Sequence, residues 1–292
     1  MCSFKIRYIV TTFEQYKISG RKNIYHTAEK IGGVMKYYPG IEISAKANPL
    51  DFVYGENVFG PVPEIRTLED IRKSLENPDC DGPEELYCIS MDVGMEKDRE
   101  EIEKRNLLFG VVTYAKGKIG DGPVRSQGHI HAISPSCQSS TPEVYEIWEG
   151  EAVIYMQESG KDDAGNCYAV HAKAGEVVIV PPYWVHATVN AKPDEQMTFG
   201  AWCVRDYGFD YDDVREHNGI AFFPKFKNEK LVWTMNPAYQ KANLIEQDAR
   251  IYEEFSIKTN EPIYTQFQKN KDMFEFVTQP QKYDNIWKNY QP

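Results

Sequence analysis

The sequence predicts an all-β core, folded as a β-sandwich or a small barrel. Three observations support this prediction: short β-type runs follow one another from Leu107, turn-forming residues separate them, and no helical pattern interrupts them. A parallel α/β sheet is disfavoured because it would need helical crossovers between its strands. The expected strands are 107–114, 143–148, 152–157, 168–171, 177–180, 187–189 and 198–204.

Glycine, proline and asparagine mark the connections between these runs. Three glycines and Pro123 within residues 117–123 predict a turn after the first strand. Further turns are expected at residues 149–151, 163–166 and 181–182. The close spacing of these turns is typical of an antiparallel β-fold.

Two helical signals precede the strands. Thr67 and Asp70 have the spacing of a capping box, and apolar residues after Thr67 repeat on one helical face. They predict a short amphipathic helix within residues 66–77. The charged segment 96–105 predicts a solvated helix or a long turn.

We divide the chain into three parts. Residues 1–46 are expected to be an N-terminal extension, appended as a strand and a helix. Residues 47–240 are expected to form the barrel domain with its preceding short helix. Residues 241–292 are expected to be a helical or irregular C-terminal extension, with partial disorder from Gln279 onward because that stretch is polar.

Composition excludes several classes of partner. The 292 residues carry a formal charge of -11, which argues against nucleic acid or an anionic membrane surface as the main partner. No apolar run approaches the roughly 18 residues of a membrane span, and charges interrupt the N-terminus as they would not in a secretory signal. The six cysteines are scattered without a CxxC pair. We expect a soluble cytoplasmic protein, to which a small phosphorylated ligand could still bind.

Histidines and one glutamate form the candidate metal site. His129 and His131 alternate in an expected strand, so both side chains point to the same face. Glu143 and Tyr145 form a second pair of this kind, and His186 follows the corner at residues 181–184. Three imidazoles and a carboxylate suit one divalent transition metal, Fe, Mn, Zn or Ni, better than Ca or Mg.

An isolated His-x-His pair is more often a surface or packed pair than a metal site. The complete pattern is more specific, because three of the six histidines fall within it at matched distances from glycine, proline and asparagine positions. His26, His171 and His217 have no matching partners, and we assign them no ligand role.

These motifs resemble the paired motifs of the cupin superfamily, whose members are double-stranded β-helix (jelly-roll) barrels. Residues 181–190, with Tyr183 where most cupins have glycine, resemble the signature of the cupin-type glucose-6-phosphate isomerases of archaea and bacteria. Residues 128–131, 142–145 and 209–211 resemble their counterparts in order. The loop between His131 and Glu143 is longer than usual and is read as an insertion. The resemblance spans roughly residues 47 to 240.

The resemblance implies a metal-dependent isomerase that interconverts glucose 6-phosphate and fructose 6-phosphate. His129, His131, Glu143 and His186 would hold the metal. Glu143 would also move the proton between C1 and C2, and Tyr145 would orient it or contact the sugar. A hydride shift would use the same residues, so the sequence leaves both routes open. No organic cofactor is expected.

Phosphate recognition is expected near the first motif. The resemblance assigns it to Ser126 and Gly128, and Arg125 or Lys118 could supply positive charge. The two cations could equally be solvated turn residues. A threonine and a tyrosine of the family pattern correspond to Val111 and Cys203 in this chain.

Two other functions remain open from the sequence. The same ligand set serves metal-dependent cupin oxygenases, and a cupin can also bind sugar without catalysis. In either case the expected partner is a small molecule, with a sugar phosphate favoured. We also expect a homodimer, by analogy with small cupins that pair through edge strands.

Overall fold

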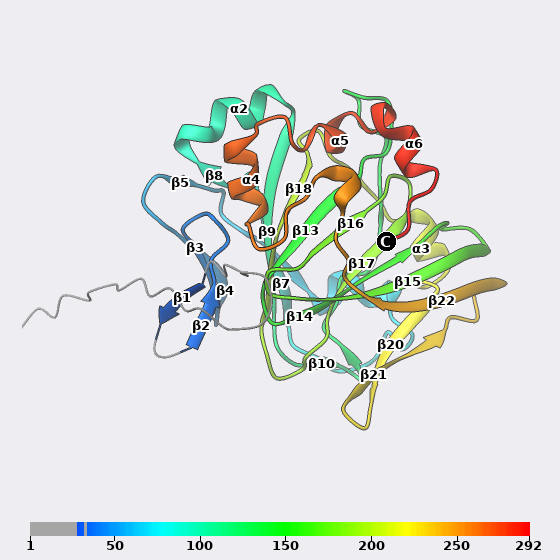
Figure 1. Cartoon of the computed structure of the whole chain (residues 1–292). Coiled ribbons are helices and arrows are strands. Elements are labelled where there is room, and N and C mark those ends of the chain that lie inside the picture. The colour runs from blue at the N-terminus through cyan, green and yellow to red at the C-terminus, as the bar shows by residue number, and fades with distance from the viewer. Residues whose placement is uncertain (1–27, 32–33) are drawn as a thin grey trace, which may run out of the picture.

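The computed structural model describes residues 28–31 and 34–292, and its centre is a cupin barrel of two β-sheets (Figure 1). The first sheet has six strands, in the order β16 (Val177–Val180), β13 (Glu143–Glu149), β18 (Met197–Val204), β9 (Leu107–Tyr114), β7 (Glu85–Met91) and β6 (Glu64–Thr67). The second sheet has the order β17 (Val185–Asn190), β14 (Glu151–Gln157), β15 (Asp163–Lys173) and β22 (Lys241–Asp248). Strands β15 and β22 are parallel, and the other neighbours in these two sheets are antiparallel.

Smaller elements surround the barrel. The short strands are β1 (Ala28–Ile31), β2 (Val34–Tyr37), β3 (Ile43–Ala47), β4 (Leu50–Tyr54), β5 (Val58–Phe59), β8 (Gly94–Met95), β10 (Lys118–Ile119), β11 (Gly122–Pro123), β12 (Ile130–His131), β19 (Phe209–Asp210), β20 (Phe222–Lys227) and β21 (Lys230–Met235). The helical segments are α1 (Leu68–Ile71), η1 (Arg72–Ser74), η2 (Glu96–Asp98), α2 (Arg99–Lys104), α3 (Asp212–Glu216), η3 (Glu253–Phe255), α4 (Ile263–Lys269), α5 (Glu275–Thr278), η4 (Pro280–Tyr283) and α6 (Asp284–Trp287). None of the helices in the described ranges is long and apolar enough to cross a bilayer.

Alternation along the strands separates the barrel interior from its outer face. On β16, Val178 and Val180 pack in the interior cluster together with Ile154 of the opposite sheet. Val177 and Ile179 pack instead in the cluster on the outer face of the six-stranded sheet. Both sets are shielded from water, because the interior is filled by side chains of both sheets and the C-terminal segment covers the outer face.

Aromatic residues attach the C-terminal segment to this outer face. Trp202 of β18 is fully buried, and its ring centroid lies 4.6 Å from that of Phe109 and 4.7 Å from that of Phe267 in α4. Figure 1 shows α4, α5 and α6 beside the six-stranded sheet. Burial of several large rings stabilises this docking by several kcal/mol, since each fully buried aromatic contributes on the order of 1.5–3 kcal/mol.

Most sequence expectations for the elements agree with the structure. Each expected strand overlaps an observed one, the capping box of Thr67 and Asp70 is present, and residues 96–105 contain η2 and α2. The expected turn at residues 163–166 is wrong, because these residues begin β15 and pair irregularly with β22.

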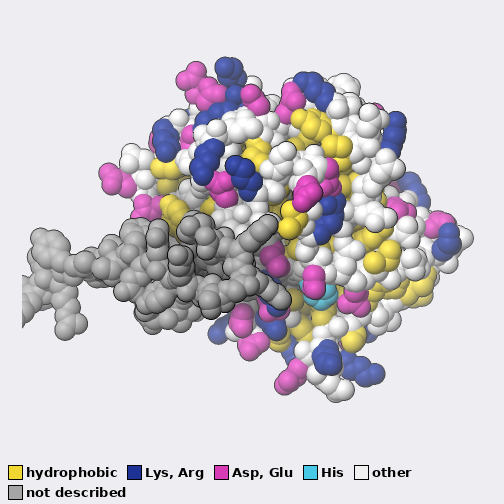
Figure 2. All heavy atoms as spheres, in the orientation of Figure 1, with side chains coloured by type: hydrophobic (Ala, Val, Ile, Leu, Met, Phe, Trp, Pro, Cys, Tyr) yellow, Lys and Arg dark blue, Asp and Glu magenta, His cyan; other side chains and the backbone are white. Residues whose placement is uncertain are grey.

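The expectation of disorder from Gln279 is also wrong. Residues after Gln279 form η4 and α6, and Tyr290 is buried with its hydroxyl donating to the carbonyl of Ile179 at 2.5 Å. The predicted extension 1–46 lies largely outside the described residues, and its described part contains β1, β2 and β3. Acidic and basic side chains are interspersed over the molecular face in Figure 2.

Glu146 is a buried carboxylate between the barrel and both terminal segments. It is 1% exposed and lies on the outer side of β13. One oxygen accepts hydrogen bonds from the Tyr37 hydroxyl and the Ile263 amide, both at 2.8 Å, and the other accepts one from the Trp148 indole at 3.0 Å. Burial raises the pKa of Glu146 to about 7 despite these donors.

This carboxylate should make folding stability fall as pH rises from about 4.5 to about 7. The unfolded chain releases the Glu146 proton near pH 4.5, whereas the folded chain holds it until about pH 7, so the stability contributed at low pH is lost over that window. The loss is on the order of 3 kcal/mol at about 1.4 kcal/mol per pKa unit. Urea unfolding at pH 5 and pH 8, compared between the wild type and Glu146→Gln, measures it. Equal pH dependence in both proteins would contradict the prediction.

Candidate metal centre

A short antiparallel contact brings the three predicted histidine ligands together inside the barrel wall. The backbone of His129, just before β12, exchanges two hydrogen bonds with that of His186 on β17, at 3.0 and 2.9 Å. His131 ends β12, and Glu143 is the first residue of β13. One ligand atom of each of the four residues lies within 4.8 Å of the others. The structure therefore brings together the four residues predicted as metal ligands.

Hydrogen bonds made by the far sides of two imidazoles determine which nitrogens face the centre. Nδ1 of His131 lies 2.9 Å from the carbonyl oxygen of Thr141, and Nδ1 of His186 lies 3.3 Å from that of Trp184. A carbonyl oxygen only accepts, so each Nδ1 carries the proton and each Nε2 presents a lone pair. Both Nε2 atoms then face Oε2 of Glu143, at 3.3 and 3.4 Å.

Electron-pair donors meeting in this way need a cation between them. The Nε2 atoms of His129, His131 and His186 are buried and have no hydrogen-bond partner in the described protein. Buried polar atoms of this kind are rare unless a water or an ion satisfies them. The residues present therefore fit a bound divalent transition metal, with Nε2 of each histidine and Oε2 of Glu143 as its ligands.

Electrostatics keep the ligands in the protonation states that metal binding requires. Burial lowers the pKa of His129 and of His186, so both imidazoles are neutral at pH 7. For Glu143, burial alone would raise the pKa, but hydrogen bonds and positive charge from His131 and His186 when these imidazoles are protonated outweigh it, and the pKa lies well below its usual range. A divalent cation in place of those protons would favour the ionised carboxylate in the same way. Glu143 is therefore ionised at neutral pH.

Tyr145 lies beside Glu143 on the inward face of β13. Its hydroxyl donates to Oε2 of Glu143 at 2.7 Å. Burial, and then the charge of Glu143, raise the pKa of Tyr145, so the phenol keeps its proton and acts as a donor. Its ring contacts Phe199 at 4.9 Å and His186 at 6.3 Å between centroids, which restricts its rotation. Tyr145 thereby orients the carboxylate.

Ser126 and Gly128 lie on the same wall as the histidines. The Ser126 hydroxyl accepts a hydrogen bond from the Thr188 amide at 3.0 Å, and Ser126 is partly exposed. Gly128 has φ +94°, and an added Cβ would come within 2.6 Å of Ile220. Only glycine suits this position, because the left-handed conformation and the close contact both exclude a side chain.

Arg125 and Lys118 are not brought together with these residues. Arg125 precedes Ser126 in an extended segment and points to the opposite side, where it donates to the carbonyl of Ser74. The Lys118 ammonium lies over the Phe226 ring at 5.3 Å, on the exposed β10–β11 hairpin. Their role in substrate binding stays a prediction, without a contact to the cluster in the described residues.

The sequence reasoning missed an aromatic wall beside the metal centre. The ring centroid of Phe209 lies 4.4 Å from that of His129, and that of Tyr211 lies 5.8 Å away. Strand β19 positions Phe209 by pairing it with His131. In the sequence, residues 209–211 show only a family resemblance, which assigns them no place in the site. Their alternating aromatic residues were the available signal that one strand face lies against the site.

The two positions at which the chain departs from the family pattern face different ways. Val111 packs in the outer cluster of the six-stranded sheet, whereas its neighbour Val112 faces the barrel interior. Cys203 is buried close enough to Glu143 for the carboxylate to contribute, after burial, to its raised pKa. Val111 therefore lies on the outer face of the sheet, away from the barrel interior.

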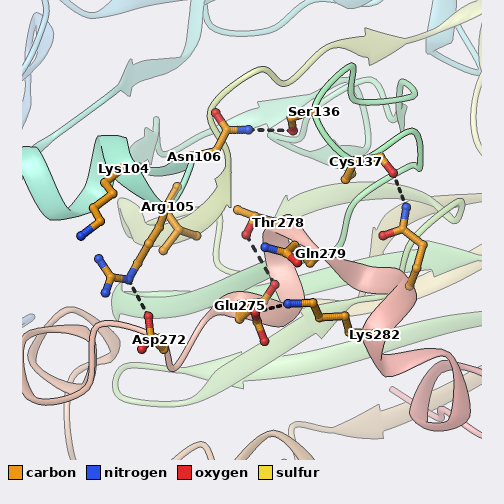
Figure 3. Close-up of a pocket in the computed structure, with 12 residues that line it drawn as sticks. Lys104, Arg105, Asn106, Ser136, Cys137, Asp272, Glu275, Thr278, Gln279 and Lys282 are labelled. Atoms are coloured by element: carbon orange, nitrogen blue, oxygen red, sulfur yellow. Dashed lines mark hydrogen bonds and ion pairs between the residues drawn. The ribbon is translucent and has the colours of Figure 1, made fainter.

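The insertion between His131 and Glu143 is held in place from two sides. The Ser134 hydroxyl and the Ser136 amide both donate to Asp206 at 2.8 Å, and Gln281 of η4 donates to the carbonyl of Cys137. A cavity of about 590 Å³ lies between this loop and the C-terminal segment. Figure 3 shows the side chains that line it. The carboxylates that line it, Asp272 and Glu275, are ion-paired with Arg105 and Lys282.

Comparison with known proteins identifies the family. Residues 73–241 match the family model described as glucose-6-phosphate isomerase (GPI). Several relatives are named glucose-6-phosphate isomerase. That of Thermococcus onnurineus is 33% identical over 45% of this chain and 60% of its own length. That of Pyrococcus furiosus is 30% identical over 49% of this chain and 69% of its own length. That of Sinorhizobium medicae is 31% identical over 39% of this chain. The chain spans about half the length of the first such relatives, 49% for the Sinorhizobium protein.

Solved structures show weaker likeness. A hazelnut vicilin (Corylus avellana) is 10% identical with a TM-score of 0.33, covering 53% of this chain and 34% of its own. An oxalate oxidase is 18% identical with a TM-score of 0.28, and the match covers 36% of this chain and 45% of the oxidase chain. At these scores the structures add nothing to the assignment, which depends on the family match over more than half of the sequence. The chain belongs to the cupin-type glucose-6-phosphate isomerase family.

Proposed function

We propose that this protein interconverts glucose 6-phosphate and fructose 6-phosphate at a divalent transition metal held by His129, His131, Glu143 and His186. The observation that carries the proposal is the cluster of three buried imidazole Nε2 atoms around an ionised carboxylate, each without a hydrogen-bond partner in the described residues. The family match supplies the substrate class.

The reaction moves hydrogen between two neighbouring carbons. From glucose 6-phosphate, a base removes the proton on C2 and returns it to C1, while a proton passes from the C2 hydroxyl to the C1 oxygen. A metal bound at this site would polarise the oxygens on C1 and C2 and lower the cost of the negative charge that develops there.

Glu143 is suited to carry the proton. It is ionised at neutral pH and 12% exposed, so a substrate can reach it. Its Oε2 atom contacts the imidazoles of His131 and His186 and accepts the hydrogen bond from Tyr145. The described residues make no such contact with Oε1, so this oxygen is the one we assign to the substrate. Tyr145 holds the carboxylate plane in place, and a positioned base contributes about 10²–10⁴-fold to rate.

The sugar phosphate would bind along the wall formed by Ser126 and Gly128. The Ser126 hydroxyl can still donate, since it acts as an acceptor toward Thr188. Gly128 would take part only through its backbone, because Ile220 fills the space that a side chain would occupy. Phe209 and Tyr211 flank His129 and would exclude water from one side of the bound sugar.

A metal-loading assay tests the proposal. Metal-free protein is loaded separately with Fe, Mn, Zn or Ni, and formation of fructose 6-phosphate from glucose 6-phosphate is followed. We expect turnover with at least one metal and none after chelation. No turnover with any metal, in protein shown by elemental analysis to hold it, would refute the substrate assignment but leave the metal site intact.

A further inference from the structure

A buried arginine without a carboxylate partner lies behind the barrel wall. Arg125 is 3% exposed, and its two terminal nitrogens donate to the carbonyl oxygens of Ser74 and Ser126. No acidic side chain of residues 28–31 and 34–292 forms an ion pair with it. Burial lowers the pKa of Arg125 to about 10, which still leaves the guanidinium charged at pH 7.

Such a charge is costly to bury. Arginine is almost never fully buried unless it is paired, and an uncompensated buried ion costs several kcal/mol. Two neutral carbonyl acceptors satisfy only part of a guanidinium with five N–H donors. An anion bound beside Arg125 would therefore offset part of the cost of burying its charge.

A cavity adjoins the guanidinium. It measures about 330 Å³ and lies between the segment after η1, the β10–β11 hairpin and β20. The other charged residues that line it are Lys225, Glu76 and Asp121. Lys225 lies 2.5 Å from Glu76 and 3.7 Å from Asp121, so both carboxylates are paired with this one ammonium and neither is paired with Arg125. Arg125 is therefore the lining charge that has no ion-pair partner among the described residues.

The carboxylates also lie farther from the interior than the cation does. The side chains of Glu76 and Asp121 are 40% and 70% exposed, so solvent screens their repulsion of an anion. At roughly 30 Å³ per water molecule, the cavity is far larger than one water site needs. It has room for a phosphate group with a short carbon chain.

This cavity is separate from the metal centre. Arg125 and Ser126 are consecutive residues of an extended segment, and their side chains point to opposite sides of the barrel wall. Arg125 faces Ser74 and the cavity, whereas the Ser126 hydroxyl bonds the Thr188 amide on the inner side. A ligand in the cavity would contact a residue one peptide away from the proposed substrate wall.

We propose that this cavity is a second anion site, which binds a phosphate group with Arg125 as its counterion. The phosphate is either inorganic phosphate or that of a small phosphomonoester. A guanidinium forms two parallel hydrogen bonds to phosphate oxygens, a geometry that backbone carbonyls cannot replace.

Binding of inorganic phosphate and of glycerol 3-phosphate to the metal-loaded protein tests the proposal by calorimetry, at ionic strength matched with chloride. We expect wild-type binding to weaken at least tenfold in Arg125→Met. Lys227→Met is the matched control, since Lys227 is an exposed cation at the end of β20 that does not line the cavity. Binding of both ligands would indicate a metabolite site, and binding of phosphate alone a site for the free ion.

Two further variants make the outcome decisive. Arg125→Lys keeps the charge without the paired donors, and should bind with intermediate affinity if Arg125→Met does not fold. His186→Ala disrupts the metal centre and should keep phosphate binding. Unchanged affinity in both Arg125 variants, or loss of phosphate binding in His186→Ala, would overturn the proposal.

Discussion

Glu143→Gln should lower kcat for the isomerisation by about 10²–10⁴-fold while substrate binding is largely retained. Glutamine preserves the size of the side chain and one oxygen near the imidazoles, but it cannot accept a proton from carbon. The loss should appear in kcat rather than in KM, because the base acts only in the transition state. Steady-state kinetics of purified protein, with metal content measured in the same samples, checks this.

Tyr145→Phe provides the matched control for this prediction. It removes the hydroxyl that donates to Glu143 but leaves the carboxylate able to react. A hydrogen bond to a charged group is worth about 1.5–3 kcal/mol, so the rate should fall by about ten- to a hundredfold, less than in Glu143→Gln. Full activity in Glu143→Gln protein that contains metal would show that Glu143 is not the base.

Isomerisation of glucose 6-phosphate in deuterated water distinguishes proton transfer from hydride transfer. If Glu143 carries a proton, fructose 6-phosphate formed in deuterated water should contain deuterium at C1, since the carboxylic acid exchanges with solvent. Complete retention of the substrate hydrogen, together with high activity in Glu143→Gln, would favour a direct hydride shift between the carbons.

The barrel could be predicted well from the sequence because its determinants are local. Strand β9 was expected at residues 107–114 and is found there, since a β-type run ends at a glycine-rich turn. The segment 163–166 was misjudged because its glycine and asparagine favour a turn, whereas Asp163 and Asn166 pair with the distant β22 and the residues between them form an irregularity within β15. That pairing depends on residues nearly 80 positions away in the chain, which no local pattern encodes.

Side chains that depend on tertiary contacts were equally hidden. Tyr290 lies in a polar stretch, and its burial follows from the outer face of the barrel that it covers. Arg125 was grouped with Ser126 because the two are adjacent, but strand alternation sends them to opposite sides. The four candidate metal ligands were predictable because strand alternation places His129 and His131 on one face and their motif spacing points to Glu143 and His186; the contact of His129 with His186 depends on strand pairing.

Divalent metal should raise the melting temperature of the metal-free protein by about 5 °C or more. Any ligand that binds only the folded chain stabilises it by about 2.7 kcal/mol at 100 times its Kd, and each kcal/mol is worth about 2–4 °C in a domain of 150–250 residues. His186→Ala should lose most of this shift. His171→Ala should keep it, because His171 lies outside the cluster and contacts Glu246 instead. Thermal unfolding with and without metal measures the difference.

The pH dependence of metal uptake gives this prediction a second readout. Protons compete with metal for imidazole, so uptake fails once the ligands are protonated. Burial lowers the pKa of His129 and of His186 from the ordinary 6.5, so protons compete with metal for these imidazoles only at a lower pH than for exposed ones. Metal binding measured by equilibrium dialysis should therefore extend to lower pH than exposed imidazoles would allow. Loss of metal uptake with a midpoint above pH 6.5 would contradict the lowered pKa of His129 and His186, and with it the buried centre that the catalytic proposal requires.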